Sequence, residues 1–343
     1  MDDVNQGRDG VSRKSTMTEV ARRAGVSVMT VSRVFSDPDS VAAETRSRIE
    51  QVAADIAYIP DGIAAALKRR ASNVVAAVVP SLTDNLYTAI LRGLSGELSR
   101  HGFVLSVAEA AYSSTEETRV VRELLRQRPA ALVLHETSHE AGLLRLIRQA
   151  GVIVIETGDL VDAPVDTVVS FSNHDATAVL TRHLLDRGRR NIAFVTLPLA
   201  RSSRARRRHD GFRSALAAAG LAAAPDAVFE AAGGYADAAA LMDRILAARP
   251  VFDAILGAGD VLAVALAIEA MKRGLAVPGD LAIASFDDHE IGRILDPPLT
   301  GLDIPREAIG RRAAEIIVGR LKGAPAVERR VDLGFALAAR AST

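Results

Sequence analysis

The chemically richest run of this 343-residue chain is Asp287-Asp288-His289-Glu290, whose carboxylates and imidazole are potential metal ligands. Consecutive residues in a turn rarely converge on one ion, however, and no pair of residues elsewhere has metal-ligand spacing. The chain also lacks a Walker A motif and a hydrolase-type nucleophile elbow, and Gly257-Ala258-Gly259 lacks the third glycine of a dinucleotide fingerprint. We therefore expect no catalytic residue, no metal and no cofactor, and we do not expect an enzyme.

A different chemistry, the recognition of DNA bases, is indicated by residues 16–35. Thr16 and Glu19 have the spacing of a capping box that starts a short helix, and Gly25 suits the left-handed turn that ends it. Ser27 can cap a second helix. The exposed face of this second helix carries Val28, Met29, Ser32 and Arg33. Two helices joined by a glycine turn, with an arginine facing outward, have the geometry that enters a DNA major groove, although an ordinary helical hairpin is the alternative for this segment alone.

A third helix and a connecting segment follow this pair. Asp37-Pro38 breaks the chain, and apolar residues then recur at helical spacing from Ala43 to Ile56, which closes a small three-helix core. Pro60 stops this helix because the residue before a proline is pushed out of helical geometry. The Ala-rich segment Asp61–Arg70 is too short to be a stable helix alone, so we interpret it as a hinge that becomes helical only when docked.

From Val74 onward, short apolar runs alternate with longer helical stretches. The predicted strands are Val74–Pro80, Phe103–Ala108, Ala131–His135, Val152–Glu156, Ile192–Leu197, Ala254–Ala258 and Leu281–Phe286. The predicted helices are Asn85–Arg100, Glu116–Arg126, Ala141–Gln149, Asp175–Asp186, Ala205–Ala219, Ala236–Ala247, Val261–Arg273 and Pro305–Leu321. This alternation indicates parallel sheets with helices on both faces. We predict an α/β fold with two doubly wound parallel-sheet subdomains and a ligand cleft at the carboxyl ends of their strands.

The composition is that of a globular protein without a membrane segment. The chain is 49% hydrophobic and 24% charged, and no apolar run reaches the ~18 residues of a membrane span. Balanced charge, 42 basic against 42 acidic residues, argues against wholesale coating of nucleic acid. The absence of cysteine excludes disulfides and fits a reducing compartment. Residues 1–15 are polar, without the apolar core of a signal peptide, and we interpret them as a disordered tail of a cytoplasmic protein.

An ordered set of motifs resembles the lactose/galactose repressor (LacI/GalR) family of bacterial transcription regulators over essentially the whole chain. These motifs are TEVARRAGVSVMTVSRV, DPDSVAAETRSRI, YIPDGIAAALKR, VVPSLTDNLYTAILRGL, HLLDRGRRNIAFV, GDVLAVALAIEAMKRGLAVPGDLAIASFDDHEIG and PPLTGLDIP. Within the family, the segments VMTVSR, YIP, VPSLT, FDDHEIG and VDLGF are most similar to gluconate-operon repressors. The resemblance implies an N-terminal helix-turn-helix DNA-binding domain, two periplasmic-binding-protein-like subdomains, and repression controlled by a small sugar or sugar acid.

The resemblance also implies which residues contact DNA. The second helix would read the major groove, with specificity carried by Val28, Met29 and Arg33. Leu67 matches a residue that wedges into the minor groove, supported by Ala64, although this hinge departs from the family by having Asp61 in place of an asparagine. The expected DNA-binding residues are Thr16, Ser27, Val28, Met29, Thr30, Ser32, Arg33, Ala64 and Leu67.

The effector site implied by the resemblance lies between the two subdomains. Tyr87 matches an aromatic residue that packs on the ligand, and Arg208 matches a ligand-binding arginine whose fork suits hydroxyls or a carboxylate. Asp260 and Asp287 match family acids, whereas Gly259 replaces an asparagine. The expected effector-binding residues are Leu86, Tyr87, His135, Glu156, Arg208, Asp260 and Asp287. The sequence leaves open which arginine faces the ligand, among Arg201, Arg204, Arg206, Arg207 and Arg208.

The predicted organisation combines these parts. The boundaries are 1–15 for the tail, 16–58 for the helix-turn-helix domain, 59–72 for the hinge, 73–171 with 301–326 for the first subdomain, and 172–300 with 327–343 for the second. The expected partners are palindromic operator DNA, a sugar or sugar-acid effector and a second copy of the chain, with no membrane. The alternative is a carbohydrate-binding protein or enzyme of the same two-subdomain fold, which would have no use for residues 16–70.

Overall fold

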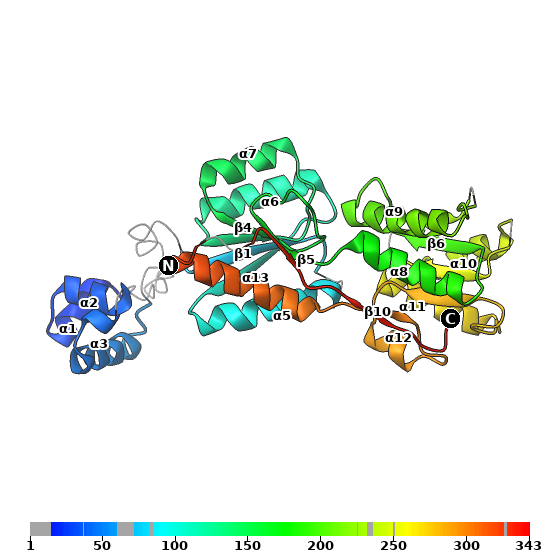
Figure 1. Cartoon of the computed structure of the whole chain (residues 1–343). Coiled ribbons are helices and arrows are strands. Elements are labelled where there is room, and N and C mark those ends of the chain that lie inside the picture. Colours follow the sequence, from blue (N-terminus) through cyan, green and yellow to red (C-terminus); the bar gives the residue numbers. More distant parts are fainter. Residues whose placement is uncertain are drawn as a thin grey trace, which may run out of the picture. The chain divides into compact units, whose positions relative to one another are not determined.

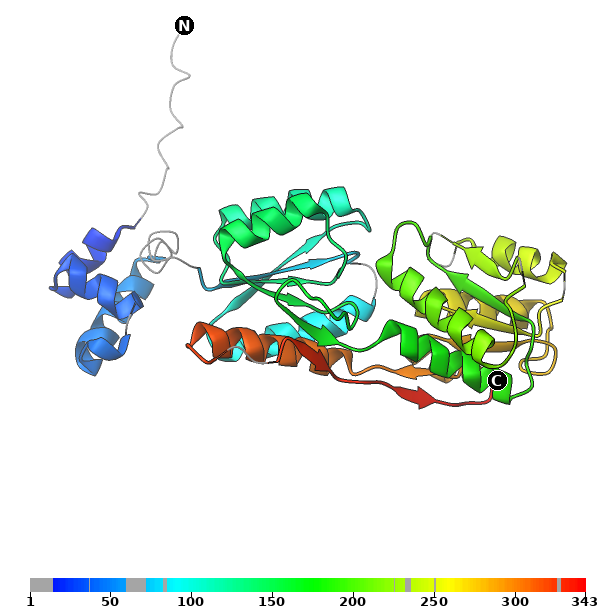
Figure 2. The same ribbon diagram turned by 45° about the horizontal axis from the view of Figure 1, so that its top comes forward.

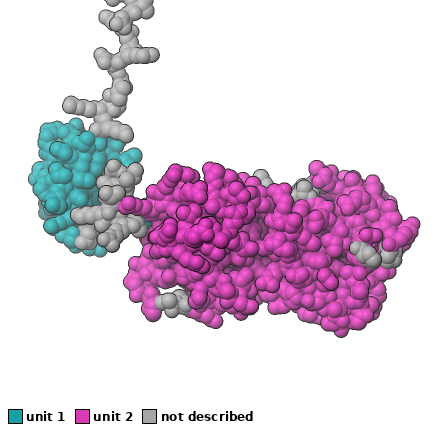
Figure 3. All heavy atoms as spheres, turned by 90° about the horizontal axis from the view of Figure 1, so that it is seen from above, with its two compact units in different colours: residues 1–72 teal, residues 73–343 magenta. Residues whose placement is uncertain are grey.

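The structure is a computed structural model that describes residues 15–36, 38–59, 72–82, 85–224, 226–231, 236–249, 251–325 and 328–343. It describes the backbone but not the side chains of Ser36, Pro38, Asn85 and Asp260. The chain divides into two compact units, residues 1–72 and 73–343 (Figure 3). The predicted tail and most of the predicted hinge, with Ala64 and Leu67, lie outside the described residues.

The first unit contains a three-helix core (Figure 1). Its helices are α1 (Met17–Ala24), α2 (Val28–Ser36) and α3 (Ala43–Asp55), with a 3-10 turn, η1 (Pro38–Ser40), before α3. The Thr16 hydroxyl accepts a hydrogen bond from the Glu19 amide at 3.3 Å, and Gly25 ends α1 with a φ of 65°. Only this half of the predicted capping box is seen, because the Glu19 carboxylate binds Arg22 and Arg23 one turn further on.

The second unit begins with a six-stranded parallel sheet in the order β11-β5-β4-β3-β1-β2. Its strands are β1 (Val74–Val79), β2 (Val104–Glu109), β3 (Ala131–Leu134), β4 (Ile153–Glu156), β5 (Thr167–Ser170) and β11 (Arg330–Asp332). The covering helices are α5 (Asn85–Arg100) and α13 (Arg306–Leu321) on one face, and α6 (Ser114–Arg126) and α7 (Ala141–Ala150) on the other (Figure 2). We call this layer the first subdomain.

The second subdomain is built on a four-stranded parallel sheet in the order β7-β6-β8-β9. Its strands are β6 (Ile192–Thr196), β7 (Val228–Glu230), β8 (Ala254–Gly257) and β9 (Ala282–Ser285). The helices are α8 (Asn173–Asp186) and α9 (Ser203–Ala218) on one face, α10 (Ala238–Ala247) and α11 (Asp260–Lys272) on the other, and the short α12 (Glu290–Ile294) after β9. The predicted α/β fold with two parallel-sheet subdomains is confirmed.

The chain passes between the two subdomains more than once. After α8 and the second sheet, β10 (Gly301–Asp303) returns toward the first subdomain and pairs antiparallel with β12 (Ala336–Ala338). The predicted boundary at residue 327 is wrong in one respect, because β11 pairs with β5 and so belongs to the first sheet. The chain then runs along the second sheet, where the Ile283 amide donates to the Ser342 carbonyl at 2.9 Å.

Two glycines let α5 and α13 pack closely. A Cβ added at Gly93 would fall on the carbonyl oxygen of Glu307, and one at Gly310 would fall on the carbonyl oxygen of Ile90. The two helix backbones therefore touch where any larger residue would separate them. This contact fixes the beginnings of both helices, which carry Tyr87 and Arg306. None of the helices in the described residues is long and apolar enough to span a bilayer.

Candidate functional site

The outward face of α2 carries the residues expected to read DNA. Val31 and Val34 are buried in the core of the first unit, which turns the opposite face of the helix outward. On that face the side chains of Val28 and Met29 are 43% and 61% exposed, and Arg33 is also exposed. The Ser27 hydroxyl accepts a hydrogen bond from the Thr30 amide at 3.1 Å and so caps the start of the helix. The structure therefore presents apolar and guanidinium groups together on one accessible helix face.

A second candidate site lies at the carboxyl end of the first sheet. Tyr87, near the start of α5, is buried, and its ring meets the His135 ring edge to face with centroids 4.7 Å apart. The Tyr87 hydroxyl lies 3.2 Å from that of Tyr112, and His135 Nδ1 lies 3.1 Å from the Thr157 hydroxyl. Burial lowers the pKa of His135 well below its usual value, and three nearby arginines lower it further. His135 is therefore neutral at pH 7 and offers one donor and one acceptor.

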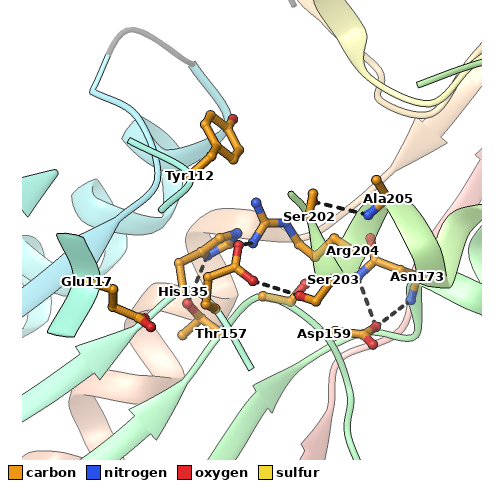
Figure 4. A network of polar contacts seen from close by, with 12 residues as sticks. Tyr112, Glu117, His135, Thr157, Asp159, Asn173, Ser202, Ser203, Arg204 and Ala205 are labelled. Carbon is orange, nitrogen blue, oxygen red and sulfur yellow. Dashed lines mark hydrogen bonds and ion pairs between the residues drawn. The ribbon is translucent and has the colours of Figure 1, made fainter. Parts of the chain in front are cut away.

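Arg204 reaches into this cluster from the second subdomain (Figure 4). Its Nη1 donates to Glu136 Oε1 at 2.7 Å, and its Nη2 donates to the Tyr87 hydroxyl at 3.1 Å. The neighbouring Ser203 hydroxyl donates to Glu136 Oε2 at 2.7 Å. Arg204 is 5% exposed, so this guanidinium is buried between the two subdomains. Arg204 is one of the five alternatives that the sequence leaves open, and Glu136 lies at a strand end that the sequence places around the site without a role of its own.

Arg208 lies one turn further along α9 and is also buried. Its Nε donates to Asn173 Oδ1 at 2.8 Å, its Nη1 donates to the Ala258 carbonyl at 2.6 Å, and its guanidinium carbon lies 3.6 Å from the centre of the Phe286 ring. The other three arginines of the cluster are exposed, namely Arg201, Arg206 and Arg207. Arg204 and Arg208 are four residues apart and share one helical face, which is the signal in the sequence that separates them from their neighbours.

Asp287 follows β9 and is buried against Arg306, with which it forms an ion pair. Among the described residues its Oδ2 has no hydrogen-bond partner, so a buried acceptor remains there. The rest of the acidic run diverges: Asp288 binds Arg293 and Arg340, and His289 Nδ1 accepts from the Ile291 amide. Asp260 begins α11, but its side chain is outside the described part of the structure.

For two of the expected effector residues, Glu156 and Leu86, the described structure shows neighbours other than Arg204 and Arg208. Glu156 is buried, its Oε2 accepts from the Val165 amide at 2.6 Å, and its Oε1 lies 3.3 Å from His139 Nε2. This is a structural environment, so the geometry does not support an effector contact for Glu156. Leu86 lines a separate hollow of about 920 Å³ with Asp287 and Arg306. A smaller hollow, of about 440 Å³, opens beside Glu136 and Ser203.

Comparisons with known proteins show which family the chain resembles. The description "Bacterial regulatory proteins, lacI family" matches residues 16–61, and "Periplasmic binding protein-like domain" matches residues 181–343. The chain is 31% identical over 326 residues to the HTH-type transcriptional regulator GntR of Escherichia coli (strain K12), covering 95% of this chain and 97% of that protein. It is 34% identical over 338 residues to the regulator of the same name from Pseudomonas aeruginosa, covering 96% of each chain.

Solved structures give the same result for nearly the whole chain. A LacI-family transcriptional regulator from Silicibacter pomeroyi superposes with a TM-score of 0.87 at 28% identity, covering 96% of this chain and 99% of that one. The lac repressor dimer bound to operator and the anti-inducer ONPF superposes with a TM-score of 0.84 at 25% identity, again covering 96% and 99% of the two chains. The likeness therefore includes both units and not only the two-subdomain fold.

Proposed function

The chain belongs to the LacI family of bacterial regulatory proteins, and on that premise we propose that it is a homodimeric transcriptional repressor controlled by a small sugar-acid effector. It binds a palindromic operator in the cytoplasm and performs no catalysis. One observation carries the proposal: a single chain combines an exposed arginine-bearing helix, α2, with a buried arginine cluster between two parallel-sheet subdomains. A purely carbohydrate-binding protein would have no use for the first of these features.

In the DNA-binding half, two copies of α2 enter successive major grooves. Arg33 forms a bidentate pair with guanine, a contact worth roughly 1–3 kcal/mol of discrimination, while Val28 and Met29 contact thymine methyl groups. Leu67, supported by Ala64, enters the minor groove at the operator centre. The dimer forms through the outer surfaces of α5 and α13.

In the effector-binding half, the ligand lies among Tyr87, Arg208 and Asp287. A guanidinium fork binds a carboxylate or a pair of hydroxyls, and Asp287 Oδ2, which has no hydrogen-bond partner among the described residues, accepts a hydrogen bond from a ligand hydroxyl. A ligand with one carboxylate and several hydroxyls, such as gluconate, matches both kinds of group. The resemblance of the sequence to gluconate-operon repressors supports this choice of ligand class.

Isothermal titration calorimetry with gluconate, related sugar acids and glucose tests the effector half. The wild-type protein binds a sugar acid, and Arg208→Ala abolishes the binding because the fork is lost. Arg213→Ala is the matched control, since Arg213 is exposed on the same helix, α9. A variant lacking Arg208 that binds the acid with unchanged affinity contradicts the assignment of this arginine. Binding of neutral sugars alone contradicts the assignment of a sugar acid as the effector, but it agrees with the proposed role as a ligand-controlled regulator.

A further inference from the structure

Two carboxylates of the first subdomain contact the second: Asp159 binds Arg207 and Asn173, and Glu136 binds Ser203 and Arg204. The contact of Glu136 is the one next to Tyr87. Glu136 follows β3 in the first subdomain, whereas Ser203 and Arg204 are the first residues of α9 in the second. Both oxygens of Glu136 are bound from the second subdomain, one by the Ser203 hydroxyl and one by the Arg204 guanidinium, each at 2.7 Å. Two charge-assisted hydrogen bonds to one half-buried carboxylate form a directional contact.

The local chemistry keeps this contact ionised. Burial alone would raise the pKa of the Glu136 carboxyl, but the charge of Arg204 and the hydrogen bonds from Ser203 and Arg204 together lower it below its usual value. Arg204 also donates to the Tyr87 hydroxyl, so it links Glu136 to the residue expected to pack on the effector. In effect, Arg204 already holds a carboxylate that the chain itself supplies.

We propose that Glu136 is a built-in carboxylate that latches the two subdomains together through Ser203 and Arg204, and that an acid effector displaces it from Arg204. This inference rests on the proposed function for the identity of the effector, but the latch itself does not depend on it. Glu136 thereby becomes a specificity-determining residue, because an anionic ligand replaces a carboxylate on the guanidinium more readily than a neutral one does.

The structure also provides room for the displaced side chain. The hollow of about 440 Å³ beside the latch is lined by Glu136 and Ser203 together with Tyr112 and His139. A Glu136 side chain released from Arg204 can turn into this hollow without moving a strand. The latch thus opens by rotation of one side chain and separation of two subdomains, not by unfolding.

The first test measures ligand affinity in Glu136→Gln, which keeps the shape of the side chain and removes its charge. Without the competing carboxylate, gluconate binds about tenfold more tightly than to wild type, whereas the affinity for glucose does not rise. Glu140→Gln is the matched control, because Glu140 lines the same hollow but binds Ser114 in its own subdomain. Equal gluconate affinity in wild type and Glu136→Gln overturns the displacement.

The second test measures the latch without any ligand. The chain has no cysteine, so Arg126→Cys in the first subdomain and Arg213→Cys in the second, both at exposed positions, accept spin labels selectively. Pulsed electron paramagnetic resonance on the labelled protein reports the distance between the two subdomains. The labelled protein is diluted with excess unlabelled protein, which excludes distances between two chains. Glu136→Gln gives a broader and longer distance distribution than wild type, and Glu140→Gln gives the wild-type distribution.

The two tests separate the two claims. If no sugar acid binds any variant, the effector class of the proposed function is wrong, while the distance distributions still decide whether Glu136 latches the subdomains. Distributions that coincide for wild type and Glu136→Gln overturn the latch. Circular dichroism spectra matching the wild type confirm that the variant is folded in either case.

Discussion

His139 makes the stability of the second unit depend on pH in a direction that the structure fixes. Its ring lies between two glutamates, with Nδ1 3.0 Å from Glu117 Oε2 and Nε2 3.3 Å from Glu156 Oε1. All three side chains are at least 96% buried. Burial alone would lower the pKa of His139, but the hydrogen bonds and charges of the two carboxylates raise it to about 9. The folded protein therefore holds the His139 proton more tightly than the unfolded chain does.

The size of the effect follows from the two pKa values. The pKa of His139 is near 6.5 in the unfolded chain and about 9 in the folded protein. At about 1.4 kcal/mol per pKa unit, this difference adds about 3 kcal/mol to the free energy of unfolding while His139 is protonated. Because the folded pKa is the higher one, this stabilisation is complete below about pH 6.5. It is lost progressively as the pH rises through about 9.

The perturbation that isolates this effect is His139→Gln, which keeps hydrogen-bonding groups but cannot be protonated. Urea unfolding followed by circular dichroism at pH 6.0 and pH 9.5 gives the free energy of unfolding at each pH. Between the two, the wild type loses about 3 kcal/mol more than the variant does. His101→Gln, which alters an exposed histidine beside Glu97, keeps the wild-type dependence. Equal losses in wild type and His139→Gln would refute the reasoning.

Two further predictions concern packing and capping. Gly310→Ala lowers the free energy of unfolding of the second unit by roughly 1–3 kcal/mol in urea, because the added Cβ would strike the Ile90 carbonyl. Gly319→Ala is the control in the same helix and has no such effect, since the nearest atom to its added Cβ is 3.7 Å away. An equal loss in both variants would contradict the close contact between α5 and α13. Thr16→Val removes the side-chain cap of α1 and lowers the stability of this helix by about 1 kcal/mol, which is measured as faster amide hydrogen exchange in α1. Thr18→Val is the control inside the helix and leaves the Glu19 amide protected.

Much of the fold could be predicted because long elements carry periodic patterns and caps. α5 begins and ends at the predicted residues, and α3 ends one residue before the prediction. The helices and strands that the sequence did not reveal are short: β7, β10, β11 and β12 have three residues each, β5 has four and α12 has five, too few to show a period. Their positions are decided by pairing with distant strands, as β11 is by β5.

Site residues could be predicted where a segment contains a single residue of the required type, and could not be predicted where several residues of that type lie close together. Tyr87 and Asp287 lie where the sequence placed them, at the carboxyl edges of the two sheets. Arg204 and Arg208 have the i,i+4 spacing of one face of α9, but Arg201 and Arg207 lie within one turn of them, and the spacing alone does not show which face turns inward. The sequence places Glu136 at a strand end near the site, within His135–Thr137, but it does not indicate a role for Glu136, since its partners lie in the other subdomain.

The most direct test of the regulator is selection of binding sites from a library of random duplex DNA with the full-length protein. The account predicts enrichment of a palindrome with a guanine in each half-site, loss of that guanine preference in Arg33→Ala, and its retention in Arg48→Ala, which alters an exposed arginine on α3. Addition of the bound sugar acid then changes affinity for the selected site by about 5- to 150-fold. Failure to enrich any sequence, or an unchanged preference in Arg33→Ala, would contradict the proposed function.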